Sequence, residues 1–191
     1  MINREIFEIN GKKTFMKAKA NAFEIGKVLL SFVEFDEKTK KSVKNIDIYM
    51  DVSEMLVFCN DVLSGRLVKM AQDKAKDNPK FPPAVFSNQG GTKSEKAGRA
   101  DGKALARVLN FGASSRAGNF VFQALSGPGK ELEQGLISME DIKNPEKRII
   151  VPCSANDLKK LCLMVKSDYQ AYLSGQYSKN AFEFERFERR Q

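Results

Sequence analysis

Two stretches of the chain follow one pattern, and this repeat sets the expected fold. They are "IDIYMDVSEMLVFCNDV" (Ile46–Val62) and "IIVPCSANDLKKLCLMV" (Ile149–Val165), and they match without a gap. Each begins with alternating apolar residues, which is typical of a strand, and continues with an apolar stripe at helical spacing. Cys59 and Cys162 stand at equivalent positions. We interpret the stretches as the ends of two structural repeats.

Both expected helices carry signals at their starts. Asp51 and Ser154 can each act as an N-cap, and Glu54 and Asp157 follow three residues later, as in a capping box. The stripes expected to be buried are Met55, Phe58, Cys59 and Val62 in the first helix, and Leu158, Leu161, Cys162 and Val165 in the second.

About four candidate strands precede each helix. In the first repeat they are Arg4–Ile9, Phe15–Phe23, Lys27–Asp36 and Ile46–Tyr49, and in the second they are Pro83–Ser87, Leu105–Phe111, Phe120–Ser126 and Arg148–Val151. Strands this close in sequence pair antiparallel through short turns, such as "DEKTKK" at residues 36–41. The expected fold class is α+β, a tandem repeat of about four antiparallel strands followed by one helix.

The expected organisation is a single domain over residues 1–175, with pseudo-repeats at about 1–76 and 83–175. Residues 87–103 are rich in glycine and lack apolar periodicity, so we expect a mobile loop there. "SGPGK" (Ser126–Lys130) reads as a hairpin turn. Residues 176–191 form a C-terminal tail of alternating aromatic and charged residues, which we expect to dock on its own body or at an interface with a partner.

Composition narrows the function classes. The 191 residues include 32 Lys and Arg against 24 Asp and Glu, and this net charge of +8 favours polyanions as partners. The chain has no histidine, which excludes every His-based triad. Its three cysteines show no C-x-x-C spacing. We therefore expect no enzyme activity, no metal and no cofactor, no membrane span, and a reducing, cytoplasmic setting.

The stretch "RVLNFGASSRAGNFVFQALSGPGK" (Arg107–Lys130) combines cations with aromatic rings. Single-stranded nucleic acid needs both, because lysine and arginine bind phosphates while aromatic rings stack on unpaired bases. Arg107, Arg116 and Lys130 are the candidate phosphate contacts. Phe111 and Phe122 are the candidate stacking residues, and core packing remains an equal alternative for both.

Two further segments supply candidate nucleic-acid contacts. In "KTFMKAKANAF", alternation places Phe15, Lys17 and Lys19 on one face, with Met16 and Ala18 on the other. The glycine-rich loop adds four cations, which we expect to become ordered on a bound strand: Lys93, Lys96, Arg99 and Lys103.

The element order, the helix stripes "EMLVFCNDV" and "DLKKLCLMV", and the hairpin "RVLNFGASSRAGNFVFQALSG" together resemble the Whirly and Pur-alpha group of single-stranded nucleic-acid-binding proteins. The resemblance covers most of residues 1–175, although the lysine-rich motif of plant Whirly proteins is missing. It implies two crossing sheets, helices on one side, a basic and aromatic strand surface, and a homo-oligomer in several members.

The resulting expectation is a protein that binds single-stranded DNA largely without sequence preference, in a process such as DNA replication. An RNA-binding or transcription-regulatory protein of the same fold is one alternative. A protein–protein adaptor that uses the tail and the hairpin is another.

Overall fold

The computed structural model describes residues 4–115 and 119–188, with only the backbone at 134 and 180–188. Its first sheet is an antiparallel meander in which neighbours in sequence are neighbours in space. The strands are β1 (Glu5–Asn10), β2 (Thr14–Lys19), β3 (Lys27–Phe35) and β4 (Ser42–Asp51). A 3-10 helix, η1 (Ala20–Ile25), ends β2 earlier than we expected from the sequence.

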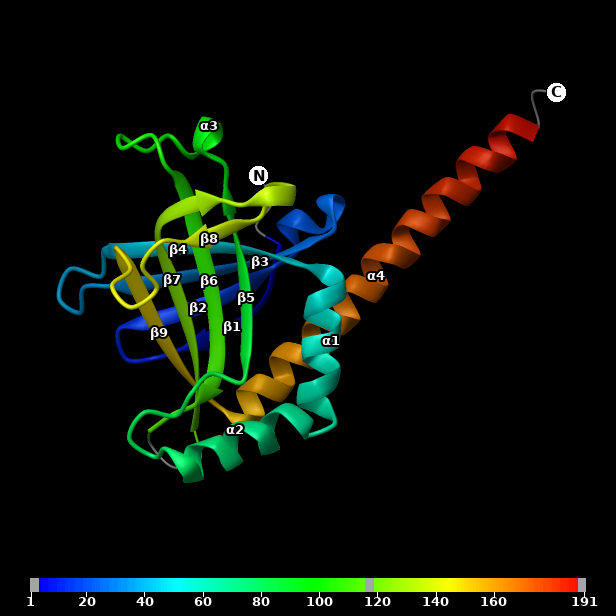
Figure 1. Cartoon of the computed structure of the whole chain (residues 1–191). Coiled ribbons are helices and arrows are strands. Elements are labelled where there is room, and N and C mark those ends of the chain that lie inside the picture. The colour runs from blue at the N-terminus through cyan, green and yellow to red at the C-terminus, as the bar shows by residue number, and fades with distance from the viewer. Residues whose placement is uncertain (1–3, 116–118, 189–191) are drawn as a thin grey trace.

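The second sheet repeats this meander with β5 (Phe86–Thr92), β6 (Ala104–Ala113), β7 (Asn119–Glu131) and β9 (Lys147–Ser154). The short β8 (Ile137–Met139) pairs with the end of β7, and β9 pairs with β7 along Asn119–Ser126. Short helices α3 (Ser94–Ala97) and η2 (Glu133–Gly135) lie in the connections. Strands of the two sheets cross in Figure 1, the second in front of the first.

Two segments that we expected to be loops are strands. Residues 86–92 form β5 and pair with β6, so a mobile loop over the whole of 87–103 is wrong. The expected turn Ser126–Lys130 lies inside β7. Glycine is required there by close packing, because a Cβ on Gly129 would lie 2.7 Å from Ile137 Cγ2. A Cβ on Gly91 would lie 2.3 Å from the Leu105 carbonyl oxygen.

A helix follows each meander. After β4 come α1 (Val52–Leu63) and α2 (Arg66–Asp77), and after β9 comes α4 (Ala155–Glu188). The backbone of residues 176–188 of the expected tail continues α4, which at 34 residues is about 51 Å long. Figure 1 shows the first part of α4 beside α1 and its second part projecting from the body. Two antiparallel meanders, each followed by helix, confirm the expected α+β fold.

The main core lies between the two sheets and the helices, and both predicted stripes are buried in it. Phe58 of α1 joins the layers, since its ring centroid lies 4.9 Å from that of Phe86 and 5.5 Å from that of Phe111. On the other face of the second sheet, a smaller cluster includes Val108, Leu125 and Ile137. The central strands β6 and β7 therefore carry buried side chains on both faces.

The two helix starts differ. Ser154 and Asp157 form the capping box: the Asp157 amide donates to Ser154 Oγ at 3.1 Å, and the Ser154 amide donates to Asp157 Oδ2 at 3.2 Å. Asp51 is the N-cap residue of α1, as predicted, but its side chain makes no cap hydrogen bond, so the expected capping box is not formed. Its carboxylate instead accepts a hydrogen bond from Lys27 Nζ at 2.6 Å.

Candidate nucleic-acid interface

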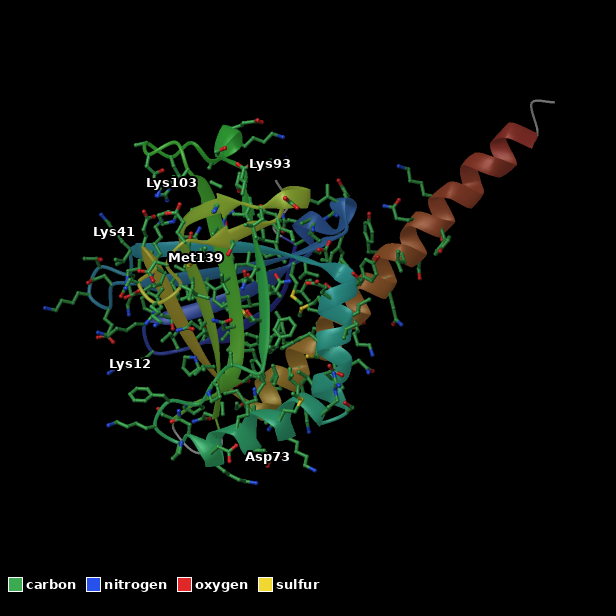
Figure 2. The ribbon with its side chains drawn as sticks, viewed as in Figure 1. Lys12, Lys41, Asp73, Lys93, Lys103 and Met139 are labelled. Carbon is green, nitrogen blue, oxygen red and sulfur yellow. The ribbon has the colours of Figure 1, made fainter. Side chains whose placement is uncertain are left out.

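Two basic turns meet at one end of the first sheet. In a meander, the β1–β2 and β3–β4 turns fall at the same end, and here the Phe35 amide donates to the Lys13 carbonyl at 3.0 Å. Figure 2 shows Lys12 and Lys41 at this end. We call the exposed lysines of the two turns the basic tip: Lys12, Lys13, Lys38, Lys40 and Lys41.

The two acidic residues of the turns, Asp36 and Glu37, interact with groups inside the basic tip itself. Asp36 Oδ1 accepts hydrogen bonds from the amides of Lys38 and Thr39, at 3.0 and 2.7 Å. The Thr39 backbone amide is the main reason that the pKa of Asp36 is lowered. Glu37 lies 3.7 Å from Lys13 Nζ. Lys38, Lys40 and Lys41 have no carboxylate partner among the described residues.

Two aromatic rings border the basic tip on the outer face of the first sheet. The centroids of Phe15 and Phe35 are 6.2 Å apart, and both side chains are half-buried. Lys17 Nζ lies 5.5 Å from the Phe15 centroid, and Lys40 Nζ lies 5.7 Å from the Phe35 centroid. These are cation–π distances. Charge and stacking surface are therefore combined in one place.

The predicted face of β2 is confirmed, but its charge is lower than the sequence suggests. Met16 and Ala18 are buried, and Phe15, Lys17 and Lys19 lie on the opposite side. Lys17 Nζ pairs with Glu8 at 2.6 Å and with Glu5 at 2.8 Å. These carboxylates raise the pKa of Lys17 through hydrogen bonds, and they compensate its charge. Lys19 makes no ion pair with the described residues and stays available.

Arg107 of β6 lies near β4, where the two sheets cross. It is half-buried, and one guanidinium nitrogen donates to Thr92 Oγ1 at 2.9 Å. Burial lowers its pKa, and the electrostatic influence of Asp47 and Tyr49 on β4 opposes that shift. Arginine remains charged despite such a shift, so this is a partly desolvated cation with donors left for a ligand.

The two other phenylalanines that we predicted to stack on bases are core residues. Phe111 is 0 % exposed and Phe122 is 1 % exposed, and their ring centroids are 5.0 Å apart beneath Phe58. A buried ring cannot stack on a ligand, so both assignments are wrong. The face of β6 and β7 that carries these rings is covered by the first sheet and α1. The predicted contact Arg116 lies outside the described residues.

The cations of the β5–β6 connection belong to the far end of the second sheet, with Lys93 and Lys103 at the top of Figure 2. Lys93, Lys96 and Lys130 are exposed. Arg99 is used structurally, because its guanidinium binds Asp101 and Glu146, both at 2.7 Å. These two carboxylates raise its pKa. Lys103 Nζ pairs with Glu140 at 2.6 Å.

The described residues contain no cluster of three or more metal-ligating side chains. All three cysteines are unpaired and buried. Burial raises the pKa of Cys153 to about 12, and the Cys59 side chain together with burial raises that of Cys162. Such thiols are poor nucleophiles. Among the described helices, none has the length and apolar character needed to span a bilayer.

No protein-family model matches the chain, and no curated protein matches it. Solved structures do. The plant transcriptional regulator PBF-2 aligns with a TM-score of 0.52 and 11% identity, covering 95% of this chain and 88% of that one. WHY1 from Arabidopsis thaliana aligns with a TM-score of 0.51 and 12% identity, covering 96% of this chain and 95% of that one. Both are Whirly proteins.

The chain has a Whirly-like fold. At this level of identity the likeness concerns the fold, and it confirms the resemblance drawn from the repeated helix stripes. Within the Whirly-like fold, the basic tip comes from the turns of the first meander, which the sequence interpretation passed over. The local pattern of Lys38, Lys40 and Lys41 indicates only a polar turn, although meander topology places that turn beside Lys12 and Lys13.

Proposed function

We propose that the protein binds single-stranded DNA, largely without sequence preference, through the basic tip and the adjoining outer face of the first sheet. The observation that carries this proposal is the meeting of five lysines with the rings of Phe15 and Phe35 at one end of a Whirly-like fold. Lysines bind phosphates regardless of sequence, and rings stack on any unpaired base.

The path of the strand follows from the position of the cations. It begins at the basic tip, passes Phe15 and Phe35, and reaches Lys19 and Arg107 toward the other end of β3. Because β3 has nine residues, this path is about 30 Å long and accommodates several nucleotides. Ion pairs compensate Lys17 and Lys27 along the way, so most of the electrostatic affinity should come from the basic tip.

The physical role would be to coat exposed strand during a process such as DNA replication, without catalysis. The three buried, unpaired cysteines support a reducing, cytoplasmic setting. A second candidate is RNA binding or transcriptional regulation, which is favoured by the fold that the chain shares with PBF-2, a plant transcriptional regulator. Competition with RNA separates RNA binding from DNA binding, since only RNA offers 2′-hydroxyl contacts.

The test is fluorescence anisotropy with labelled single-stranded DNA, duplex DNA and RNA at several salt concentrations. The double variant Lys38→Gln, Lys41→Gln removes two charges from the basic tip. We expect weaker binding and a salt slope that is smaller by about 1.4, at about 0.7 per lost phosphate contact. The matched control is Lys159→Gln, Lys160→Gln, which removes two exposed charges from α4.

Several-fold tighter binding of the single strand than of the duplex is expected, because a duplex hides its base faces. Equal affinity for both would contradict the stacking component. If the two double variants lose affinity equally, the basic tip is not the site and only the net charge matters.

A further inference from the structure

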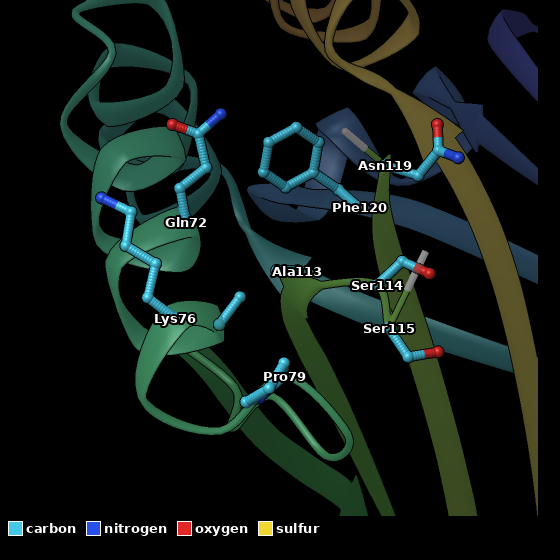
Figure 3. A pocket seen from close by; sticks show the side chains of 9 residues that line it. Gln72, Lys76, Pro79, Ala113, Ser114, Ser115, Asn119 and Phe120 are labelled. Atoms are coloured by element: carbon cyan, nitrogen blue, oxygen red, sulfur yellow. The ribbon is translucent and has the colours of Figure 1, made fainter. Parts of the chain in front are cut away.

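The loop between α2 and β5 carries Phe81, which is 72 % exposed, whereas every other phenylalanine side chain that the structure describes is buried or half-buried. The Phe81 amide donates to Asn78 Oδ1 at 3.1 Å. Figure 3 shows Pro79 beside a hollow between the end of α2 and the β6–β7 hairpin. A Cβ on Gly112 would lie 3.1 Å from the Pro83 carbonyl oxygen, so the loop also packs closely on β6. A fixed backbone therefore displays an aromatic ring to solvent.

Phe81 repeats the lysine–phenylalanine arrangement of the candidate interface. Among the described residues, a lysine ammonium lies over a phenylalanine ring at three places, and two of these rings are Phe15 and Phe35 beside the basic tip. At the third place, Lys80 Nζ lies 5.8 Å from the Phe81 centroid. Lys80 makes no ion pair with the described residues. Its charge is therefore available to a phosphate next to an exposed ring.

Strand β9 lies between the basic tip and this loop. Next to the β1–β2 turn, Thr14 Oγ1 donates to the Ile150 carbonyl of β9 at 2.8 Å. The half-exposed Ile150 and Pro82 of the loop line one small hollow of about 130 Å³, and none of the described residues that line it is acidic. Arg148 points to the same side of β9 and is exposed. A surface without acidic side chains therefore leads from the basic tip to Phe81.

The arrangement of these segments in space agrees with their contacts. Figure 1 shows the β1–β2 turn and the loop between α2 and β5 on the same side of the molecule, the side on which β9 borders the second sheet. A strand held at the basic tip can thus reach the loop without crossing the helices.

We propose that Phe81 is a further stacking site for the bound single strand. From the basic tip the strand runs in two directions, over Phe15 and Phe35 as described above, and across β9 to the loop. There one unpaired base stacks on the Phe81 ring, and Lys80 binds a neighbouring phosphate. This inference rests on the proposed function, because it extends the same site.

The chain contains no tryptophan, so Phe81→Trp introduces a single indole that reports on this position. A base stacked on an indole quenches its fluorescence. The matched control is Tyr177→Trp, since Tyr177 is 73 % exposed and lies in the second half of α4, which projects from the body in Figure 1. Both variants are titrated with a twelve-residue oligo(dT), and anisotropy of a labelled strand measures binding in parallel. We expect quenching in Phe81→Trp alone, with equal affinity for both variants.

Affinity measurements separate stacking from charge. Phe81→Ala and Phe81→Leu both remove the ring and should weaken binding about tenfold, the scale of one lost stacked base, with an unchanged salt slope. Lys80→Gln should lower the salt slope by about 0.7, the value for one phosphate contact. Tyr177→Ala should change neither quantity. Because Phe81 is exposed, these variants should keep the melting temperature of the parent protein.

The two proposals fail in different ways. If the labelled strand binds while Phe81→Trp stays unquenched, the loop is not part of the site, and the proposed function stands without it. If the strand does not bind the parent protein, the proposed function fails and this extension fails with it. Fluorescence of Phe81→Trp that changes with protein concentration but not with the oligonucleotide would assign the ring to a protein interface and overturn the stacking site.

Discussion

At the scale of the residue, the phenylalanines divide into two groups by what covers them. Phe15 and Phe35 lie on the outer face of the first sheet, whereas Phe111 and Phe122 of the second sheet are covered by the first sheet and α1. We expect Phe35→Ala to weaken single-strand binding by about 1–3 kcal/mol with an unchanged salt slope, because it removes stacking and no charge. Anisotropy titrations at several salt concentrations check this.

Phe111→Ala is the matched core variant. It should cost about 3–5 kcal/mol of unfolding free energy, because it leaves a cavity in the main core. Melting temperature and affinity are to be measured together for both variants. If Phe35→Ala lowers the melting temperature as much as Phe111→Ala, its ring is structural and the stacking assignment is lost.

The sequence predicted which residues share a strand face, but not which face is covered. Alternation correctly placed Phe15, Lys17 and Lys19 together and separated them from Met16 and Ala18. Alternation also puts Arg107 and Phe111 of β6 on one face, but it could not show that the first sheet crosses over Phe111 while leaving Arg107 at the margin. Which part of a face is buried depends on packing against distant elements, and no local pattern records it.

At the scale of the element, the two equivalent helix starts give a matched pair of variants. Ser154→Ala removes a formed capping box and should lower the unfolding free energy by about 1 kcal/mol. Asp51→Ala removes no cap hydrogen bond, only an exposed ion pair with Lys27, so its effect should be smaller. Denaturant unfolding of both variants gives the comparison, and an equal or larger loss for Asp51→Ala would contradict it.

Sequence reasoning missed the strand segments that are rich in glycine, a residue that favours turns. Glycine-rich residues 86–92 are strand because β6 pairs along them, and Gly91 and Gly129 make room for Ile137 of β8. Local propensity favours turns at such residues, but tertiary packing overrides it. Strongly periodic elements, such as α1 and the first half of α4, were predictable because their pattern and their burial agree.

At the scale of the whole molecule, the helical side carries apolar surface without a partner among the described residues. A groove between α1 and α4 has Leu56, Val57, Tyr169 and Leu173 in its lining, and Leu163 and Met164 of α4 are exposed. Exposed apolar side chains gathered on one side of a protein often mark an interface with another chain. We therefore expect a second copy of the chain to cover this side.

Val57→Glu should shift the assembly toward monomer, because it places a charge in the groove. Val43→Glu is the control, since Val43 on β4 is 61 % exposed and Val57 is 62 % exposed. Light scattering coupled to size exclusion measures the mass of each. A monomeric parent protein, or equal dissociation by both variants, would count against an interface here.

The burial of β6 and β7 on both faces gives the two meanders unequal resistance to opening. Their backbone amides are screened by the main core on one side and by the cluster around Val108, Leu125 and Ile137 on the other. The first sheet instead leaves its outer face, where we place the nucleic-acid site, without such a second cluster. The backbone amides of β1 and β2 should therefore exchange with deuterium earlier than those of β6 and β7. The surface proposed to hold the strand would then open locally while the centre of the molecule stays folded.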